Sequence, residues 1–500
     1  MAGLAREVVA AAVFALSAAM DAFTAAFQVP NLVRALFADA ALQGAFVPVF
    51  TELLERGERR QAFRVASSLF TLLVVVLGAL TLLFTVFAPW VMALVVPGFE
   101  EQSSGLAVGL ARLMFPIVLL LALSGLVVGM FNSFGHFSVP ALAPLAWNAV
   151  IIAALVLLAP LLAEEDRIYA YAIGVLAGTV VQLVLPLPWL RGHGGGFTLS
   201  FEWRNPHVLR VLRLMLPVTI ALGLINFSLL INSFFGSLVG QGAVAAIDKA
   251  FRIYMLPQGL FSVAVATILF PALSRFAARG ALDDLRATMA NGVRQIAMLL
   301  IPSAAIMAVL AEPITRLVYE HGAFDPEDTT LVSEAMFWWA FSLPFQGVSL
   351  LLSRTFFSLQ RTWATTVLAG LNLVVNVVVA ALLYRSLGVA GIVIGTVAGT
   401  VGMTVAQAFA LGRHLRGVEG AKTLWAVARM LLAAAALGAV SYVLWSALDA
   451  ALGRSLPAQL VTVGGAIAAG LVVYAGAVWA LRVPEAAQIR ALVSTRLRRS

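Results

Sequence analysis

The chain is a succession of long apolar runs separated by short polar stretches. A helix needs about 20 apolar residues to cross the hydrocarbon core of a bilayer. The runs are unbroken, whereas strands of a membrane barrel alternate between apolar and polar residues, so the pattern argues against a barrel. It predicts an all-α polytopic membrane protein with about fourteen spans, over residues 2–18, 21–50, 66–96, 106–131, 139–162, 168–189, 209–236, 244–273, 291–319, 331–353, 362–384, 388–411, 424–448 and 457–481.

The composition excludes a soluble enzyme and a disordered chain. Of the 500 residues, 62% are hydrophobic and 11% are charged, whereas a soluble domain has about 25% charged residues. The chain has no cysteine, and its five histidines lack the spacing of metal ligands. Neither a phosphate-binding loop nor a nucleophile elbow is found. We therefore expect no enzyme activity, no metal site and no cofactor.

The charges of the loops predict the orientation in the membrane. Alternate loops, beginning with 51–65 and ending with the tail 482–500, carry 21 Lys and Arg residues, whereas the opposite loops carry 3. Positive charge is enriched in cytoplasmic loops, so an even number of spans with both termini in the cytoplasm is expected. This distribution also accounts for most of the formal charge of +8, so no nucleic-acid partner is needed.

The chain contains an internal duplication. AAMDAFTAAFQVP at 18–30 matches AAIDKAFRIYMLP at 245–257, and PVFTELLERG at 48–57 matches PALSRFAARG at 271–280. Two further matches fall at nearly the same offset, with Pro89 and Pro313 at the start of one pair. Six spans separate the matched elements, and six is even, so the two halves form a parallel repeat.

The repeat predicts the domain organisation. We expect an N-terminal lobe of six spans, a C-terminal lobe of six spans, two appended helices and a basic cytoplasmic tail. Subtracting the repeat offset from the start of the seventh span predicts a truncated first span; a cleaved signal peptide is the alternative interpretation. The predicted boundaries are 1–190, 207–413, 424–481 and 482–500.

Four basic residues fall inside predicted spans, close to four acidic residues. A charge at mid-bilayer costs about 2.5–3.5 kcal/mol on insertion scales, so it is expected to face a partner or a watery cavity. One interpretation is ion pairing between the lobes. The other is a cationic cavity for an anionic substrate, where the planar fork of arginine favours phosphate. The basic residues are Arg6, Arg34, Lys249 and Arg252, and the acidic ones are Glu7, Asp21, Asp39 and Asp248.

Other features of the spans have ordinary explanations. Four arginines near span ends are expected to snorkel to the interface. Pro30 and Pro257 occupy matching positions and are expected to kink their helices, either at a substrate region or only for packing. Two Gly-x-x-x-Gly motifs, Gly174–Gly178 and Gly395–Gly399, predict close helix packing. The four arginines are Arg112, Arg294, Arg316 and Arg429.

Several motifs together closely resemble the MurJ (MviN) family. They are DAFTAAFQVPNLVRALFADAALQGAFVPVFTE at 21–52, FNSFGHFSVPALAPLAWN at 131–148, TILFPALSRFAARG at 267–280 and VYEHGAFDPEDT at 318–329. The resemblance implies a lipid II flippase of the bacterial plasma membrane, which moves the undecaprenyl-linked peptidoglycan precursor to the outer leaflet by alternating access. It also implies that the last two spans form a groove for the lipid tail.

The resemblance assigns roles to single residues. The family's essential basic residues match Arg6, Arg34 and Arg252, and its acidic residue in the Asp-Ala-Phe motif matches Asp21. The chain departs from the family at Phe251, where many relatives have an acidic residue. Relatives with a sodium site have carboxylates where this chain offers asparagines, which argues against sodium coupling and leaves the coupling ion open. These asparagines are Asn232, Asn372 and Asn376.

The resulting hypothesis is that the arginines bind the pyrophosphate of lipid II. The carboxylates would orient the arginines or pair with them when the cavity is empty. We expect a monomer embedded in membrane lipids. The alternatives are an exporter of another polyprenyl-linked glycan, a cation-coupled multidrug antiporter of the same superfamily, and a scaffold in a cell-wall complex. The candidate substrate-binding residues are Arg6, Asp21, Arg34, Asp39, Lys249 and Arg252.

Overall fold

The structure, a computed structural model, describes residues 2–37, 40–136, 138–190, 200–415, 417 and 419–485. In this part of the chain the regular elements are all helices. The prediction of an all-α polytopic membrane protein is confirmed. Contacts divide the chain into two compact units, Met1–Ala245 with His321–Phe324, and Ala246–Glu320 with Asp325–Ser500.

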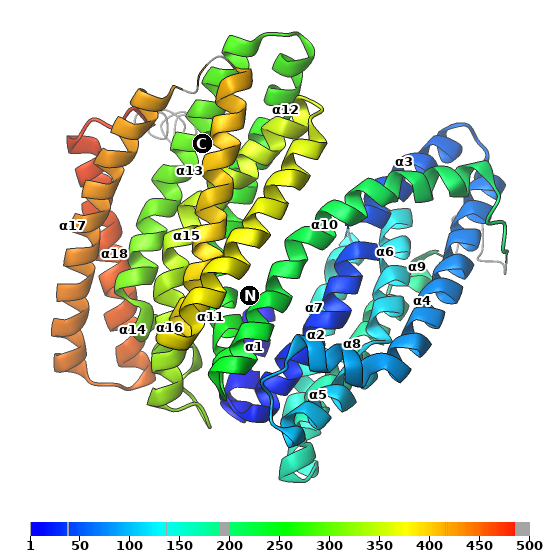
Figure 1. Cartoon of the computed structure of the whole chain (residues 1–500), viewed down its shortest axis with the longest axis horizontal. Helices are drawn as coiled ribbons and strands as arrows, with labels where there is room; N and C mark the ends of the chain where they lie inside the picture. Colours follow the sequence, from blue (N-terminus) through cyan, green and yellow to red (C-terminus); the bar gives the residue numbers. More distant parts are fainter. Residues whose placement is uncertain are drawn as a thin grey trace. The chain divides into compact units, whose positions relative to one another are not determined.

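The first unit is a bundle of helices, drawn from blue to green in Figure 1. Helix α2 packs against α5 and α10, α3 against α6 and α10, and α7 against α1 and α8. Aromatic rings fill part of its core; for example, Phe84 and Phe115 stack with centroids 3.8 Å apart. Its elements are α1 (Ala2–Phe14), α2 (Ala18–Phe37), α3 (Ala40–Glu55), α4 (Arg59–Val95), α5 (Glu101–Met114), α6 (Ile117–Ser133), α7 (Ser138–Leu157), η1 (Ala159–Leu161), η2 (Glu164–Asp166), α8 (Arg167–Val184), α9 (Leu187–Leu190), α10 (Pro206–Val239) and the beginning of α11 (Ala243–Pro257).

The second unit contains the rest of α11 and the helices that follow it. Helices α17 and α18 pack against each other and against α13, and an apolar core with Met298, Leu437 and Ala466 joins them. The hydroxyl of Tyr474 donates to the carbonyl of Met298 across this core, at 3.0 Å. The elements are η3 (Gln258–Ser262), α12 (Val263–Ala278), α13 (Leu282–Val309), α14 (Ala311–Tyr319), α15 (Pro326–Ser358), α16 (Thr362–His414), α17 (Gly420–Leu452) and α18 (Leu456–Ala480).

Helix α16 is a hairpin of two helices. Gly388 interrupts it with φ 55° and ψ −130°, a backbone conformation that favours glycine. After this bend, Gly395 lies against Ala380 and Gly399 against Asn372, so the second half runs back along the first. An added Cβ would come within 2.8 Å and 2.6 Å of the facing backbone, which confirms the close packing predicted for this motif. The bend separates the two spans that the sequence predicts at 362–384 and 388–411.

The other Gly-x-x-x-Gly motif also packs closely. On α8, Gly174 lies against Ala154 and Gly178 against Trp147, and an added Cβ would come within 2.8 Å and 2.9 Å of them. Small residues let the backbones of neighbouring helices approach, as is common in membrane bundles.

Ten helical stretches in the described residues are long and apolar enough to cross a membrane. They carry large exposed apolar side chains, for example Leu82 at 72% and Trp479 at 72% exposure, as expected for surfaces that face lipid. One of the ten, 363–414, contains both halves of the α16 hairpin. The predicted spans 2–18, 21–50 and 209–236 are not among the ten, so the count of fourteen stays a prediction.

The two matched prolines differ in their effect on the backbone. Helix α2 continues past Pro30. The α-helix α11 ends at Pro257. A π-helical segment, η3, follows it directly, and α12 begins where η3 ends. Proline lacks the N–H that would close a helical turn, and π-helical segments often occur at functional sites. The predicted distortion is therefore present at Pro257.

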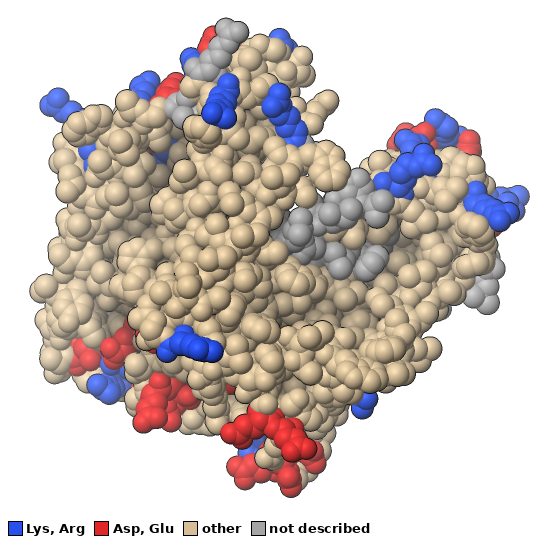
Figure 2. Space-filling view, viewed as in Figure 1, with Lys and Arg blue, Asp and Glu red and all other residues tan. Residues whose placement is uncertain are grey.

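Opposite charges lie at opposite ends of the first unit. Helix α4 begins at an exposed basic turn with Arg56, Arg59 and Arg60, and near its other end come the exposed Glu100 and Glu101. Figure 2 shows Lys and Arg gathered at the end of this unit that carries the α3–α4 turn. This separation agrees with the asymmetry of the loop charges.

Candidate functional site

Arg6 lies buried within the first unit. Its side chain is 8% exposed and forms an ion pair with Glu7. The guanidinium carbon lies 4.8 Å from the centre of the Trp147 ring, and the indole N–H of Trp147 donates to Thr179 at 3.1 Å. The indole is thus fixed as a platform for a cation. Its burial and its ion pair with Glu7 leave little of the Arg6 guanidinium accessible to a ligand.

Arg34 is half-buried near the end of α2. Its Nε and Nη2 both donate to Oδ1 of Asn31, at 3.0 Å and 2.8 Å. Asn31 is one helical turn earlier, in the Pro-Asn-Leu motif. The two bonds to one amide oxygen fix the orientation of the guanidinium. The role of Asn31 was missed in the sequence, although its spacing of three residues was a usable signal.

Asp21 caps the beginning of α11. Its carboxylate is buried and accepts the backbone N–H of Gly242 at 2.5 Å and that of Ala245 at 2.7 Å. A negative charge here satisfies free amides and interacts favourably with the helix dipole. Asp21 therefore holds the start of the helix that carries Lys249 and Arg252. Asp39 lies outside the described residues.

The basic residues of α11 have different environments. Arg252 donates from Nε and Nη2 to the carboxylate of Asp248, at 3.1 Å and 3.2 Å, and its side chain is 33% exposed. Lys249 is fully buried, with Nζ 5.4 Å from the ring centre of Tyr319. The hydroxyl of Tyr319 also donates to the backbone carbonyl of Lys249 at 3.2 Å.

The candidate residues are divided between the two units. Arg6, Asp21 and Arg34 belong to the first, whereas Lys249 and Arg252 belong to the second. Of the basic residues, Arg34 is half-buried and the side chain of Arg252 is 33% exposed, while Arg6 and Lys249 are buried against aromatic rings. The joint contribution of these residues to one binding cavity stays a prediction.

Two arginines expected to snorkel do not do so. Arg294 of α13 is buried; its Nε donates to Glu485 at 2.5 Å and its Nη1 to Glu419 at 3.2 Å. Arg316 of α14 is buried and forms an ion pair with Asp449. The snorkelling interpretation is wrong for both, because carboxylates from distant parts of the chain meet them. Arg112, in contrast, is exposed.

Outside the predicted spans, Glu52 at the end of α3 joins two arginines. It accepts from Arg210 at 2.8 Å and from Arg56 at 2.6 Å. The hydrogen bond from Arg210, together with its charge, lowers the pKa of Glu52 below its ordinary value, and Arg56 adds to this. The ion pair with Arg210 links α3 to the beginning of α10.

This lowered pKa predicts a pH-dependent stability. A carboxylate with a lowered pKa stabilises the folded state above its unfolded pKa, near 4.5, and the contribution is lost as the pH falls through the folded pKa. We expect Glu52→Gln to lower the thermal midpoint slightly at pH 7 and to have no effect once Glu52 is protonated. Unfolding of the purified protein in detergent measures this, with Glu55→Gln as the control. A difference that grows on acidification would contradict it.

The comparisons with known proteins place the chain in a family. The family model described as "Lipid II flippase MurJ" matches residues 10–463. A probable lipid II flippase MurJ of Rhizobium meliloti is 32% identical over 482 residues, covering 94% of this chain and 89% of the relative. The structure is similar to a lipid II flippase MurJ in an inward closed conformation, with a TM-score of 0.78, 22% identity and coverage of 98% and 97%. It also shares its fold with an inward-facing multidrug resistance MATE transporter, with a TM-score of 0.71, 16% identity and coverage of 84% and 96%. The chain therefore belongs to the MurJ family of lipid II flippases.

Proposed function

We infer that this chain is a transporter that moves lipid II from the inner to the outer leaflet of the bacterial plasma membrane, and that it is not an enzyme. The observation that carries this inference is the family match over residues 10–463. The cationic residues within its membrane helices support it, since lipid II carries a pyrophosphate. The separation of basic and acidic loops supports an orientation with both termini in the cytoplasm.

For the binding step, Arg34 and Arg252 hold the pyrophosphate directly. Both present a guanidinium that is at least partly accessible and oriented by a neighbour on its own helix. Lys249 adds positive potential from a buried position, Arg6 contributes when its pairing with Glu7 is exchanged for the ligand, and Asp21 positions the beginning of α11. A buried charge acts more strongly than an exposed one because the local dielectric is low.

For the transport step, the two lobes alternate between inward-open and outward-open states. A ligand shifts such an equilibrium only by binding one state more tightly than the other. The arginines of the two halves therefore lie together around the pyrophosphate in one state and apart in the other. The inside-negative membrane potential supplies about 2.3 kcal/mol per charge per 100 mV. No cofactor is needed, and the protein works as a monomer.

The test is rescue of cells depleted of their own lipid II flippase. We expect expression of this chain to restore growth and the exposure of lipid II on the outer leaflet. Exposure is measured by cleavage of lipid II with an enzyme that acts only from outside. Arg361→Ala, which removes an exposed arginine of a predicted cytoplasmic loop, is the matched control and should rescue equally well. Expression in the membrane without restored exposure would contradict the proposal.

The second candidate is export of another polyprenyl-linked glycan. The cationic spans favour it equally, because such lipids also carry pyrophosphate. Rescue of lipid II exposure that persists when an excess of the other glycan lipid is supplied would exclude it.

A further inference from the structure

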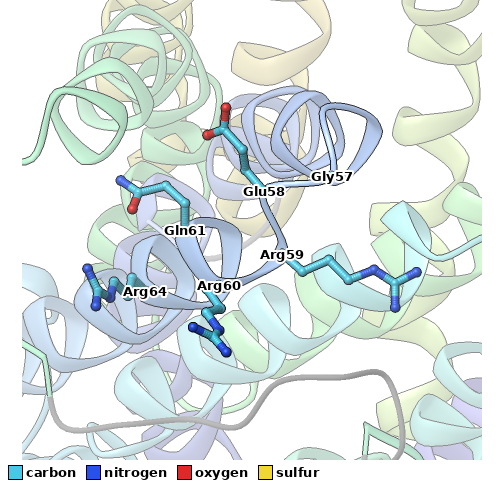
Figure 3. Close-up of a pocket in the computed structure, with 6 residues that line it drawn as sticks. All are labelled: Gly57, Glu58, Arg59, Arg60, Gln61 and Arg64. Atoms are coloured by element: carbon cyan, nitrogen blue, oxygen red, sulfur yellow. The ribbon is translucent and has the colours of Figure 1, made fainter.

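An open hollow of about 600 Å³ lies on the surface at the α3–α4 turn, and the candidate transport residues are not among those that line it. It is lined by Gly57, Glu58, Arg59, Arg60, Gln61 and Arg64. Figure 3 shows the three arginine side chains spread around the turn, with Arg60 and Arg64 on one side and the carboxylate of Glu58 turned away from them. The cavity therefore offers a concentration of positive charge to solvent.

The three arginines of this cavity have no carboxylate partner within the part of the chain that the structure describes. Nearby Arg56 differs, because Glu52 pairs with it and with Arg210. Helix α4 also begins without a side-chain cap, so its first backbone amides remain available to a ligand. Open amides and guanidinium groups on the same turn form a site for an anion.

The duplicated half provides an internal comparison. The turn between α12 and α13 matches the α3–α4 turn, and both contain a glycine with positive φ, Gly57 at 76° and Gly280 at 68°. Helix α13 has Asp283 and Asp284 in its first turn, as the helix dipole favours. Helix α4 has Arg59 and Arg60 in its first turn, where the dipole disfavours them, and Arg60 matches Asp283 when Gly57 is aligned with Gly280. A bound anion would offset this unfavourable arrangement in the first half.

The position of the arginines on α4 indicates where the anion comes from. Val75 and Leu82 follow Arg64 by about three and five whole helical turns, so all three lie on one face. This face is exposed to lipid, since Val75 is 50% and Leu82 72% exposed. The apolar run begins at Leu69, about 7.5 Å along the helix from Arg64, and the headgroup region adds about 5–7 Å to each side of the hydrocarbon core. Arg60 and Arg64 thus continue a lipid-facing stripe into the headgroup region.

We propose that this cavity binds the phosphate of an anionic phospholipid from the cytoplasmic leaflet. Arg60 and Arg64 bind the phosphate oxygens, Arg59 adds positive potential, and the acyl chains lie along the exposed apolar face of α4. The site is distinct from the transport pathway and fixes the end of the first unit at the membrane surface.

The test uses the purified full-length protein after delipidation. Native mass spectrometry follows the binding of dioleoylphosphatidylglycerol and of phosphatidylcholine with the same chains. We expect preferential binding of the anionic lipid. We also expect an apparent Kd about tenfold or more weaker in the double variant Arg60→Gln with Arg64→Gln, since two charged contacts are lost. The double variant with lysine at both positions should retain most of the preference.

The matched control is Arg275→Gln with Arg279→Gln, which removes the same charge from the equivalent turn of the second half. It should leave the preference unchanged. Equal loss in both glutamine variants, or no loss in Arg60→Gln with Arg64→Gln, would overturn the proposal. Binding of inorganic phosphate alone as tightly as the lipid would also overturn it, because the acyl chains would then add nothing. An unchanged thermal midpoint of the lipid-free variants shows that they are folded.

Discussion

Arg252→Ala is expected to reduce lipid II exposure on the outer leaflet about tenfold or more in flippase-depleted cells. The substitution removes a charge-assisted, bidentate donor that is one-third exposed on α11. Arg252→Lys keeps the charge but loses the fork, so intermediate transport is expected. Lipid II exposure is measured by external enzymatic cleavage at matched levels of protein in the membrane.

A substitution of Asp248, the partner of Arg252, distinguishes a role of Arg252 in phosphate binding from a purely structural role. Asp248→Asn removes the carboxylate that Arg252 contacts at 3.1 Å but leaves the guanidinium in place. We expect this variant to retain most of its transport. If Arg252 served only to neutralise Asp248, removing both charges together would restore activity. Recovery of transport in the double variant Asp248→Asn with Arg252→Ala is therefore the result that would refute the phosphate-binding role.

Arg294→Ala is expected to destabilise the protein by about 3–5 kcal/mol, because it leaves a buried carboxylate without its partner. Glu485, whose side chain is 1% exposed, would lose the donor at 2.5 Å. Chemical or thermal unfolding in detergent measures the loss. Arg286→Ala is the control, since its partner Asp283 is 91% exposed and such pairs contribute about 0–1 kcal/mol.

A neutral pair tests the electrostatic origin of this effect. Arg294→Met combined with Glu485→Gln removes both charges and should recover most of the lost stability, because desolvating an ion pair is itself costly. An equally unstable double variant would show that the packing of the arginine side chain, rather than its charge, is what matters.

Much of the fold could be predicted because the length of an apolar run and the positions of glycines can be read directly from a short stretch of sequence. The boundary between 362–384 and 388–411 is the position of the bend at Gly388. The Gly-x-x-x-Gly motifs likewise predict helix contacts that the structure contains. Spans with weaker periodicity are harder to predict; the predicted span 21–50, for example, contains parts of two helices, most of α2 and most of α3.

The candidate site could be predicted only in part. The free-energy cost of a charge within the bilayer identifies charged residues that need a partner, but it does not say which residues are the partners. The cost of placing a charge in the bilayer singles out Arg6, Arg34, Lys249 and Arg252. In the structure Arg34 and Arg252 are partly exposed, whereas Arg6 and Lys249 are buried. The partners of Asp21 are backbone amides more than 220 residues away, which no side-chain motif reports. Similarly, Arg316 pairs with Asp449, which lies 133 residues later in the chain. The sequence shows only that Arg316 lies near the end of a span, and this position suggested snorkelling.

The buried pairs have a consequence for motion. Glu419 directly precedes α17 and binds Arg294 of α13, while Asp449 near the other end of α17 binds Arg316 of α14. These two ion pairs lie about 45 Å apart along the axis of α17, so a rotation of α17 about one of them would break the other. We therefore expect α17 to move together with α13 and α14 during the transport cycle.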